Sequence, residues 1–419
     1  MTKDLCVYPG EMLLPADHVD HTAWACVACD QYTAQPEYWR EVERLVGEKP
    51  SVYHMILPEC WLDQAEARIP LIHAAMRRYL TDGTLTPGVE RGFILTERST
   101  GTGARLGLMC LLDLEHYDPA PGARTLVRAS EGTVEGRIPP RVRMRENAPL
   151  ENSHVMLLMD DPMHSVTEPL FDRRDELQKL YDFPLMMNGG HLTGYAVTED
   201  KDVQAVYDAL DALRARLDAS NPLLFVVGDG NHSLATAKAC WEKLKPTLTP
   251  AQTAAHPARF TLVEIENIRD DALQFEPIHR VLFGYDGDDL LDEFSRFAAS
   301  CGIPVAEPGA DGQPITVVYE GKEATLNVQN GPRALAVETL QALLDAWLKA
   351  HPQCRLDYIH GEQAVRELVK GEGVVGFLLP KPEKETLFSA VAEKGALPRK
   401  SFSIGEANEK RYYMECRRK

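Results

Sequence analysis

The sequence predicts an α+β protein built around a mixed sheet, and three features lead to this prediction. Amphipathic helical patterns and apolar strand patterns both recur along the 419 residues. They do not follow the regular strand–helix–strand alternation of a parallel α/β fold. The chain is 44% hydrophobic and 26% charged, which is ordinary for a globular protein of two or three domains.

Most of the predicted elements lie in the first two thirds of the chain. Helical apolar spacing predicts helices over residues 36–50, 63–83, 168–182 and 201–220. Apolar or alternating runs predict strands over 92–100, 104–117, 154–160, 191–200, 222–227 and 258–267. The first two of these strands are expected to form a hairpin around Gly101 and Gly103. An Arg-rich polar segment, 127–153, leads into the strand at 154–160.

The pattern changes near Gly284, where we place a domain boundary. Residues 275–284 predict a short strand or a turn. The elements expected after the boundary are a helix at 285–302, a hairpin at 315–329, a helix at 336–351, and a strand, a helix, a basic loop and a last strand within 373–416. We therefore expect a main domain over residues 1–284 and a smaller α/β region over 285–419, whose C-terminal Arg-Lys-Ser loop returns to the site.

Composition and charge exclude several classes of protein. The chain has no run of about eighteen apolar residues, and its first residues do not resemble a signal peptide, so neither a membrane span nor secretion is expected. Nine scattered cysteines do not indicate a disulfide framework, which favours a cytoplasmic location. The formal net charge of −18 argues against nucleic acid as a partner, but it is compatible with a small anionic ligand in a local basic pocket. The sequence does not fix the oligomeric state.

The densest local chemistry lies in residues 223–246, LLFVVGDGNHSLATAKACWEKLKP. The apolar run at its start predicts a central strand, and apolar residues on one helical face follow until Pro246. Residues 228–233, GDGNHS, therefore form a strand-to-helix turn, called the elbow below. Its two glycines allow a tight bend and close approach of a ligand. The free N–H groups of the first helical turn form an anion site, and Asn231 or Ser233 can cap the helix.

The residues alone leave two interpretations of the elbow open. Asp-Gly, Asn and Ser are common in turns and helix caps, so the elbow can be simply a well-made turn in which His232 is a satisfied polar residue. Alternatively, it is a phosphate cradle in which Asp229 and His232 face the ligand. It is not a Walker loop, because it lacks the Gly-Lys-Ser/Thr ending, and its glycine spacing is not that of a dinucleotide fingerprint.

The segment GDGNHSLATA resembles the DGHHRYETA signature of the bacterial and archaeal domain-of-unknown-function family ten-fifteen. Further segments are similar to that family in the same order: SVYHMILPE (51–59), RASEGTVEGR (128–137), FEPIHRVL (275–282), VVGFLLPKP (374–382) and LPRKSFS (397–403). The signature is in turn similar to the helix-opening loops of sulfiredoxin and of ParB-like free serine kinases. This resemblance implies a ParB/sulfiredoxin-like mixed-sheet core, nucleotide binding with ADP or ATP and Mg²⁺ as cofactors, and phosphoryl transfer to a small hydroxylated metabolite, with free serine as the leading candidate.

Position by position, Asp229, Gly230 and His232 match the signature of the family. Two positions depart from it. Asn231 stands where sulfiredoxin has its reactive cysteine, which argues against sulfinic-acid repair. Ser233 stands where the signature has an arginine, so the positive charge for a phosphate has to come from elsewhere in the chain.

Phosphoryl transfer needs cations on the phosphates, a metal ion on a carboxylate and a base for the accepting hydroxyl. We expect the catalytic residues to be Asp229, His232 and Glu131, with Asp229 also as the Mg²⁺ ligand. Arg128, Arg137, Arg141 and Arg143 form the densest basic cluster and are the candidate substitutes for the missing arginine. The expected phosphate- or nucleotide-binding residues are Gly228, Gly230, Asn231, Ser233, Arg128, Arg141, His279, Arg280, Lys400 and Ser401.

Three further features remain open. The C-x-x-C formed by Cys26 and Cys29 has no second pair, so a metal or redox role is not favoured. Asp30, next to it, is at least as plausible a site residue. His154 and His191 stand at strand starts, where they either fill the core or line a site.

The function favoured by these observations is nucleotide-dependent phosphoryl transfer to a small hydroxylated metabolite. One alternative is a non-catalytic protein that binds a nucleotide or metabolite and regulates a partner. Another is a phosphatase of a small phosphate ester such as phosphoserine. A ParB-like DNA-binding role is disfavoured by the negative charge and by the lack of a helix-turn-helix with a basic face.

Overall fold

The computed structural model describes residues 5–120, 122–133, 138–287, 289–303, 305–306, 312–328 and 335–419. The fold is a mixed α and β fold, as predicted, and it divides into two compact units. Unit 1 comprises Met1–Gln274, Val391–Ala396 and Gly405–Lys419, and unit 2 comprises Phe275–Ala390 and Leu397–Ile404. The domain boundary placed near Gly284 from the sequence stays a prediction.

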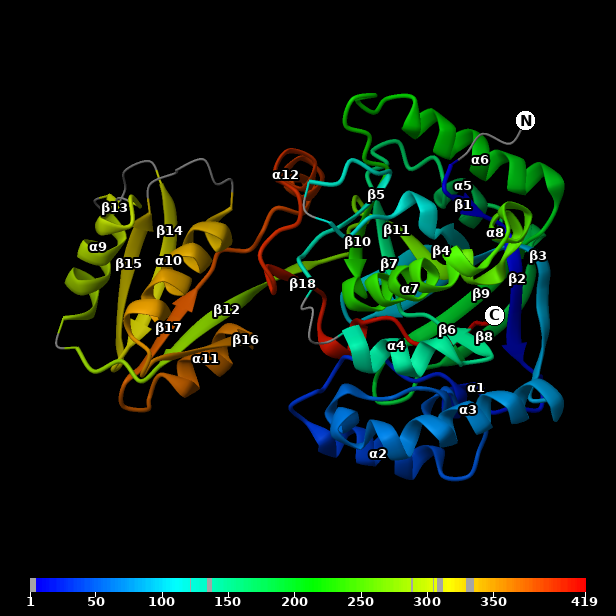
Figure 1. The fold of residues 1–419 in the computed structure, drawn as a ribbon, viewed down its shortest axis with the longest axis horizontal. Helices are drawn as coiled ribbons and strands as arrows, with labels where there is room; N and C mark the ends of the chain where they lie inside the picture. The colour runs from blue at the N-terminus through cyan, green and yellow to red at the C-terminus, as the bar shows by residue number, and fades with distance from the viewer. Residues whose placement is uncertain are drawn as a thin grey trace. The chain divides into compact units, whose positions relative to one another are not determined.

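Unit 1 is organised around one large mixed sheet (Figure 1). Its strands are β1 (Val7–Tyr8), β2 (Gly10–Pro15), β3 (Leu85–Thr100), β4 (Gly103–Asp113), β5 (Val127–Ala129), β6 (Leu150–Asn152), β7 (Met156–Met159), β8 (Gln178–Pro184), β9 (His191–Val197), β10 (Phe225–Asp229), β11 (Phe260–Asn267) and β19 (Cys416–Arg418). Among the described residues the order is β5-β10-β7-β11-β4-β3-β2-β19-β6, with β9 on β3, β8 on β9 and β1 on β4. The pairs β5–β10 and β7–β11 are parallel, whereas β10–β7 and β11–β4 are antiparallel.

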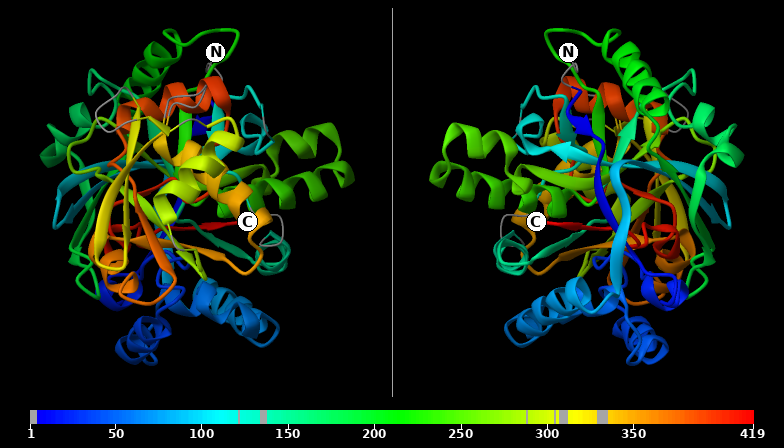
Figure 2. Two further views of the ribbon diagram at one scale, coloured as in Figure 1. Left: turned by 90° about the vertical axis from the view of Figure 1, so that its left-hand side faces the viewer. Right: turned by 90° about the vertical axis from the view of Figure 1, so that its right-hand side faces the viewer.

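The helices of unit 1 cover both faces of this sheet, as the right-hand view in Figure 2 shows for α2 and α3 on one side and α6 on the other. They are α1 (His21–Trp24), α2 (Pro36–Val46), α3 (Ala65–Thr81), α4 (Ile138–Glu146), α5 (Glu168–Phe171), α6 (Asp200–Arg214), α7 (Asn231–Leu244) and α8 (Pro250–Ala255). Because neighbouring strand residues point to opposite faces, β3 serves two cores. Ile94 packs in the cluster of α2 and α3, and Leu95 packs in the cluster of α6 and α7.

Unit 2 has a second sheet of order β13-β15-β14-β17-β12-β16, with β18 on β12. Its strands are β12 (Phe275–Phe283), β13 (Val305–Ala306), β14 (Gln313–Tyr319), β15 (Lys322–Val328), β16 (Arg355–His360), β17 (Val374–Leu378) and β18 (Phe402–Ile404). Its helices are α9 (Leu290–Ser300), α10 (Ala336–Ala350) and α11 (Glu362–Leu368), and α12 (Leu387–Lys394) contributes residues to both units. Phe294 of α9 stacks on Trp347 of α10 with ring centroids 4.1 Å apart, which joins the two helices in one core.

One prediction of secondary structure was wrong. The helix predicted over 168–182 ends as α5 at Phe171, and its second half is strand β8. Leu177, Leu180 and Tyr181 have helical spacing, but the alternation of Tyr181 and Phe183, both buried, suits a strand paired with β9. The polar segment 127–153 contains β5 and α4, because prolines are tolerated in the first turn of a helix and α4 begins Ile-Pro-Pro.

The last fifteen residues run through the centre of unit 1. Arg411 donates to Glu264 Oε2 and to Glu415 Oε2, each at 2.5 Å, and its Nε donates to the carbonyl of Ser153 at 3.1 Å. The side chains of these three charged residues are at most 5% exposed. The segment also forms a bridge between Tyr412 and Val27.

Arg411→Met is expected to destabilise unit 1 strongly, because it leaves two buried carboxylates without their cation. The expected loss is about 3–5 kcal/mol of unfolding free energy. Arg418→Met is the control, since Arg418 forms an exposed pair with Glu11 and should lose less than about 1 kcal/mol. Urea titration by tryptophan fluorescence measures both variants, because Trp24, Trp39, Trp61 and Trp241 lie in unit 1. Equal losses in the two variants would contradict the assignment.

Candidate functional site

The elbow joins β10 directly to α7 through one left-handed glycine. Gly230 has φ +79° and forms the N-cap of α7, with no side-chain cap, so the predicted capping by Asn231 or Ser233 was wrong. A Cβ on Gly230 would lie 3.0 Å from Val155 Cα and 3.4 Å from His154 Cδ2, so the position needs glycine for space as well as for φ. The first N–H groups of α7 have no partner within the helix and point out of its N-terminus.

The two strands that flank β10, β5 and β7, bring further polar residues to the end of the sheet at which the elbow lies. β5 runs parallel to β10, so Ser130 follows β5 beside the elbow, and Asn231 Nδ2 donates to Ser130 Oγ at 3.0 Å. β7 runs antiparallel to β10 with Met156 opposite Asp229, so His154 precedes β7 at this edge. The register between Val227 and Asp229 shifts at Gly228, a β-bulge of the kind that redirects side chains next to functional sites.

A buried charge cluster lies at the elbow. Lys410 Nζ is 3.4 Å from Asp229 Oδ2, and the two side chains are 8% and 15% exposed. His154 Nε2 is 3.6 Å from Asp30 Oδ2, and His154 Nδ1 is 2.7 Å from the hydroxyl of Tyr413. Asp30, named from the sequence as a plausible site residue next to the C-x-x-C, lies beside His154.

The pKa values of the His154–Asp30 pair are shifted in opposite directions. Burial lowers the pKa of His154, but the carboxylates of Asp30 and Asp229 outweigh burial and raise it above its ordinary value. Burial raises the pKa of Asp30, but the imidazolium of His154 and the ammonium of Lys410 hold it well below its ordinary range. Each member of the pair therefore favours the charged form of the other.

Two oxygen atoms of the elbow have unused hydrogen-bonding capacity. Asp229 Oδ1 accepts from the N–H of Gly230 at 2.8 Å, whereas Asp229 Oδ2 and Asn231 Oδ1 are buried and accept no hydrogen bond from any residue that the structure describes, although Asp229 Oδ2 has the ion pair with Lys410. A buried oxygen acceptor without a hydrogen bond is unfavourable, so a bound ligand or ion that contacts these atoms would be stabilised there.

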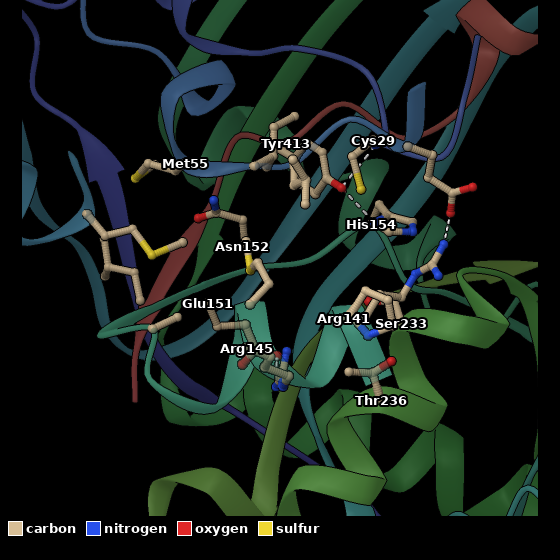
Figure 3. A pocket seen from close by; sticks show the side chains of 18 of the residues that line it. Cys29, Met55, Arg141, Arg145, Glu151, Asn152, His154, Ser233, Thr236 and Tyr413 are labelled. Atoms are coloured by element: carbon tan, nitrogen blue, oxygen red, sulfur yellow. Dashed lines mark hydrogen bonds and ion pairs between the residues drawn. The ribbon is translucent and has the colours of Figure 1, made fainter. Parts of the chain in front are cut away.

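A pocket adjoins the elbow along one side of α7 (Figure 3). It encloses about 780 Å³ free of protein atoms, part of it open to solvent, and Ser233 and Thr236 line it from α7. Arg141 of α4 lies beside Ser233 and forms an ion pair with Glu59. The other lining residues are Cys29, Met55, Ile56, Leu57, Leu62, Met76, Pro140, Met144, Arg145, Ala148, Leu150, Glu151, Asn152, His154 and Tyr413.

The structure brings several of the predicted site residues together and sets one apart. Gly228, Asp229, Gly230 and Asn231 form the elbow, Ser233 opens the pocket wall, and His232 lies in the first turn of α7. Glu131 follows Ser130 at the same sheet edge, and Arg141 reaches the pocket from α4. Arg128, however, donates to the carbonyls of Thr125 and Pro222 and to Asn221 Oδ1, so it holds the loop that enters β10 at the strand's other end. Arg137 lies outside the described residues.

The other four predicted ligands belong to unit 2. Arg280 is buried, donates to the carbonyls of Arg399 and Lys400 at 3.3 and 2.7 Å, and so holds the Arg-Lys-Ser loop. Ser401 Oγ donates to the carbonyl of Pro398 at 2.6 Å, and His279 Nδ1 accepts from the N–H of Leu379 at 3.1 Å. Their phosphate-binding role, like the return of this loop to the site, stays a prediction.

The sequence analysis did not identify Lys410 and Tyr413, because it assigned only a final strand to the tail. The signal was present in KRYYMEC (410–416), where three charged residues stand within a run of large apolar ones close to the C-terminus. Such charges are expected to be buried and paired. Burial raises the thiol pKa of Cys29 in the C-x-x-C to about 11 and that of Cys26 further, which disfavours the reactive thiolate form of both.

The family model for "Protein of unknown function (DUF1015)" matches residues 9–347. The chain belongs to the DUF1015 family. A search of curated proteins finds no match. No helix in the described ranges combines the length and the apolar character that a membrane span requires.

Comparison with solved structures finds matches of low identity and low TM-score. A free serine kinase variant in complex with AMP is 13% identical with a TM-score of 0.40, over 71% of this chain and 88% of that one. A conserved hypothetical protein from Pyrococcus furiosus is 11% identical with a TM-score of 0.36, over 73% and 90%. C-terminally truncated SbnI from Staphylococcus aureus is 12% identical with a TM-score of 0.36, over 71% and 83%. Function therefore has to be argued from the site of this DUF1015 protein itself.

Gly230→Ala is expected to lower the free energy of unfolding more than a glycine replacement whose only cost is the positive φ of the backbone. Gly83 has φ +83° with nothing within 4 Å of its Cβ position, so Gly83→Ala should cost about 1–2 kcal/mol. Gly230→Ala should cost about 1–3 kcal/mol more, because its Cβ also presses on the backbone of Val155. Urea unfolding gives both values, and equal costs would mean that the close approach at the elbow is not constraining.

The His154–Asp30 pair predicts a pH-dependent contribution to stability. The raised pKa of His154 contributes stability that is complete below the ordinary pKa of histidine and is lost as pH rises through the raised value. The lowered pKa of Asp30 contributes stability that is lost only at strongly acidic pH. The Tm difference between the wild type and His154→Gln should therefore shrink as pH rises from about 6 to about 9. His18→Gln, at an exposed position, is the control, and a constant difference for His154→Gln would contradict the pairing.

Proposed function

We propose that unit 1 binds the phosphates of a nucleotide at the elbow and transfers a phosphoryl group to a small hydroxylated metabolite. The observation that carries this proposal is the position of Lys410. Its ammonium group is buried 3.4 Å from Asp229 Oδ2, at the N-terminus of α7. A cation therefore stands beside the helix end whose first turn has Ser233 in place of the arginine of the family signature.

The groups at the elbow suit the charge requirements of phosphoryl transfer. Such reactions depend mainly on positioning and on stabilising negative charge. The first N–H groups of α7, which have no acceptor within the helix, supply fixed donors for phosphate oxygens. Lys410 and the imidazolium of His154 supply two cations, and their burial makes their fields stronger than those of exposed charges.

The elbow also offers oxygen atoms suited to Mg²⁺. Asp229 Oδ2 and Asn231 Oδ1 are buried oxygens without a hydrogen-bond donor among the described residues, and Mg²⁺ prefers oxygen ligands of this kind together with phosphate oxygens and water. Within the described ranges no group of three or more His, Cys, Asp or Glu residues could hold a metal alone, so a nucleotide would have to complete the site. When bound, Mg²⁺ would neutralise phosphate charge.

Two roles remain for the other predicted catalytic residues. Glu131 follows the carboxyl end of β5, next to the strand that leads to the elbow, and is the proposed base for the accepting hydroxyl. His232, in the first turn of α7, is proposed to contact the ligand.

We further infer a ParB/sulfiredoxin-like core, which the strand–elbow–helix beside a parallel strand supports. A cytoplasmic location is proposed because all nine cysteines are free.

Lys410→Ala is expected to weaken nucleotide binding. A hydrogen bond to a charged group is worth about 1.5–3 kcal/mol, so affinity for Mg²⁺-ADP or Mg²⁺-ATP should fall about tenfold or more. Calorimetry and the nucleotide-induced rise in Tm measure this change. Lys179→Ala, at an exposed ion pair of unit 1, is the control. Lys410→Ala/Asp229→Asn removes both charges together. Its Tm, compared with that of Lys410→Ala, shows how much of the effect of the single variant comes from leaving a buried carboxylate without its cation.

Catalysis is tested by incubating the protein with Mg²⁺, ADP or ATP and a panel of hydroxylated metabolites, and by detecting phosphorylated products by ³¹P NMR. Product that depends on nucleotide and is lost in Lys410→Ala supports the proposal. Saturable nucleotide binding without product would favour the regulatory alternative. Release of phosphate from phosphoserine without nucleotide would favour the phosphatase. The absence of both nucleotide binding and phosphorylated product would overturn the proposal.

A further inference from the structure

The pocket beside the elbow has an apolar wall that is continuous with the core of unit 1. Met55, Met76 and Leu150 are at most 1% exposed, and they belong to the same hydrophobic cluster as the helices α2 and α3. Leu62 and Met144 are partly buried and pack against this cluster at the pocket. This apolar wall does not stabilise a phosphate group, which is fully polar. It can instead bury the carbon skeleton of a ligand.

Charges of both signs stand at the other end of the pocket. Arg141 pairs with Glu59, and their side chains are only 18% and 8% exposed. Figure 3 shows Arg141 on the side of Ser233 and His154, whereas Met55 lies on the opposite side of the pocket. Glu59 is held in place by its backbone, since its N–H donates to the carbonyl of Cys29 at 2.8 Å. A carboxylate at this position would repel a purely anionic ligand group.

A zwitterion fits such a pair better than either an anion or a cation. A ligand carboxylate can take the guanidinium of Arg141 in a two-bond contact, which is the preferred geometry between these groups. A ligand ammonium can at the same time take the carboxylate of Glu59. Both charges of the protein then keep a partner, and neither is left buried and unpaired.

We propose that this pocket binds an α-amino acid with an apolar skeleton larger than that of serine. Its carboxylate would contact Arg141, its ammonium Glu59, and its side chain the wall formed by Leu62, Met144 and their buried neighbours. This inference rests on the proposed function only where it identifies the phosphoryl acceptor. That acceptor would be a hydroxylated amino acid of this kind, with its hydroxyl toward the elbow.

Binding is tested by calorimetry on the full chain without nucleotide, with L-leucine as the probe. Leucine is expected to bind at least about tenfold more tightly than glycine or serine, because it buries several more methylene equivalents. 3-Methylbutylamine, which lacks the carboxylate, and 4-methylpentanoate, which lacks the ammonium, should each bind at least about tenfold more weakly than leucine. Equal affinity for leucine, glycine and serine, or equal affinity for leucine and its two analogues, would overturn the proposal.

Two variants connect the binding to these residues. Glu59→Gln/Arg141→Gln removes both charges at once, so it should retain the Tm of the wild type and lose leucine binding by about tenfold or more. Leu62→Ser should reduce the preference for leucine over glycine, and Leu71→Ser, at a position 70% exposed, should leave it unchanged. Arg143→Gln, on the same helix as Arg141 but with a 56% exposed side chain, is the control for charge. Unaltered leucine binding in the double variant would refute the assignment.

Turnover separates this inference from the proposed function. With Mg²⁺ and ADP or ATP, kcat/KM is compared for L-serine, L-threonine and L-3-hydroxyleucine. An increase along this series supports both proposals. Tight leucine binding with no phosphorylated product supports the pocket assignment and speaks against the kinase. Phosphorylation of serine in preference to 3-hydroxyleucine, with no binding of leucine, supports the kinase and overturns the pocket assignment.

Discussion

The ion pairs of Arg411 in the centre of unit 1 are the interaction on which the site depends. Burial lowers the pKa of this guanidinium, but Glu264 and Glu415 outweigh burial and raise it, so Arg411 stays charged out of contact with water. Such a cluster tolerates little displacement, because moving any member leaves a buried charge unpaired. The segment that carries Arg411 is therefore held in one register, and its neighbours Lys410 and Tyr413 are placed at Asp229 and His154. A slip of one residue would turn both side chains to the wrong face.

The same segment organises the loop opposite the elbow. The N–H of Ala28 donates to the carbonyl of Arg411, the N–H of Tyr413 donates to the carbonyl of Cys26, and the hydroxyl of Tyr413 accepts from the N–H of Cys29. These bonds fix the turn that carries Asp30 next to His154. The side chains of Cys26 and Cys29 pack in the core of unit 1 at this turn, Cys26 fully buried and Cys29 partly buried.

How far the sequence predicts the molecule depends on how local each feature is. The elbow was placed correctly between a strand and a helix, because its glycines and the apolar spacing of α7 lie within twenty residues of each other. Local apolar spacing gave a wrong prediction at β8, whose residues fit both a helix and a strand. Pairing with β9, which is not local, decides for the strand. Membership of the DUF1015 family was also predicted, since it rests on ordered motifs rather than on contacts. The partners of Asp229 and His154 were not predictable, because Lys410 and Tyr413 come from a distant segment and no local pattern links them to the elbow.

The departure at Ser233 has a physical consequence for the proposed site. An arginine in the first turn of α7 would travel with the helix that it serves, whereas Lys410 reaches the elbow only when the C-terminal segment is docked. A lysine also acts as a point charge without the fixed fork of an arginine, so its direction is set by Asp229 and by the backbone around Arg411. A phosphate bound between α7 and Lys410 would contact two segments that meet only in the native state. Binding would then stabilise the docked segment by mass action, and the Arg411 cluster would in turn preorganise the cation, so that the proposed ligand and the centre of unit 1 reinforce each other.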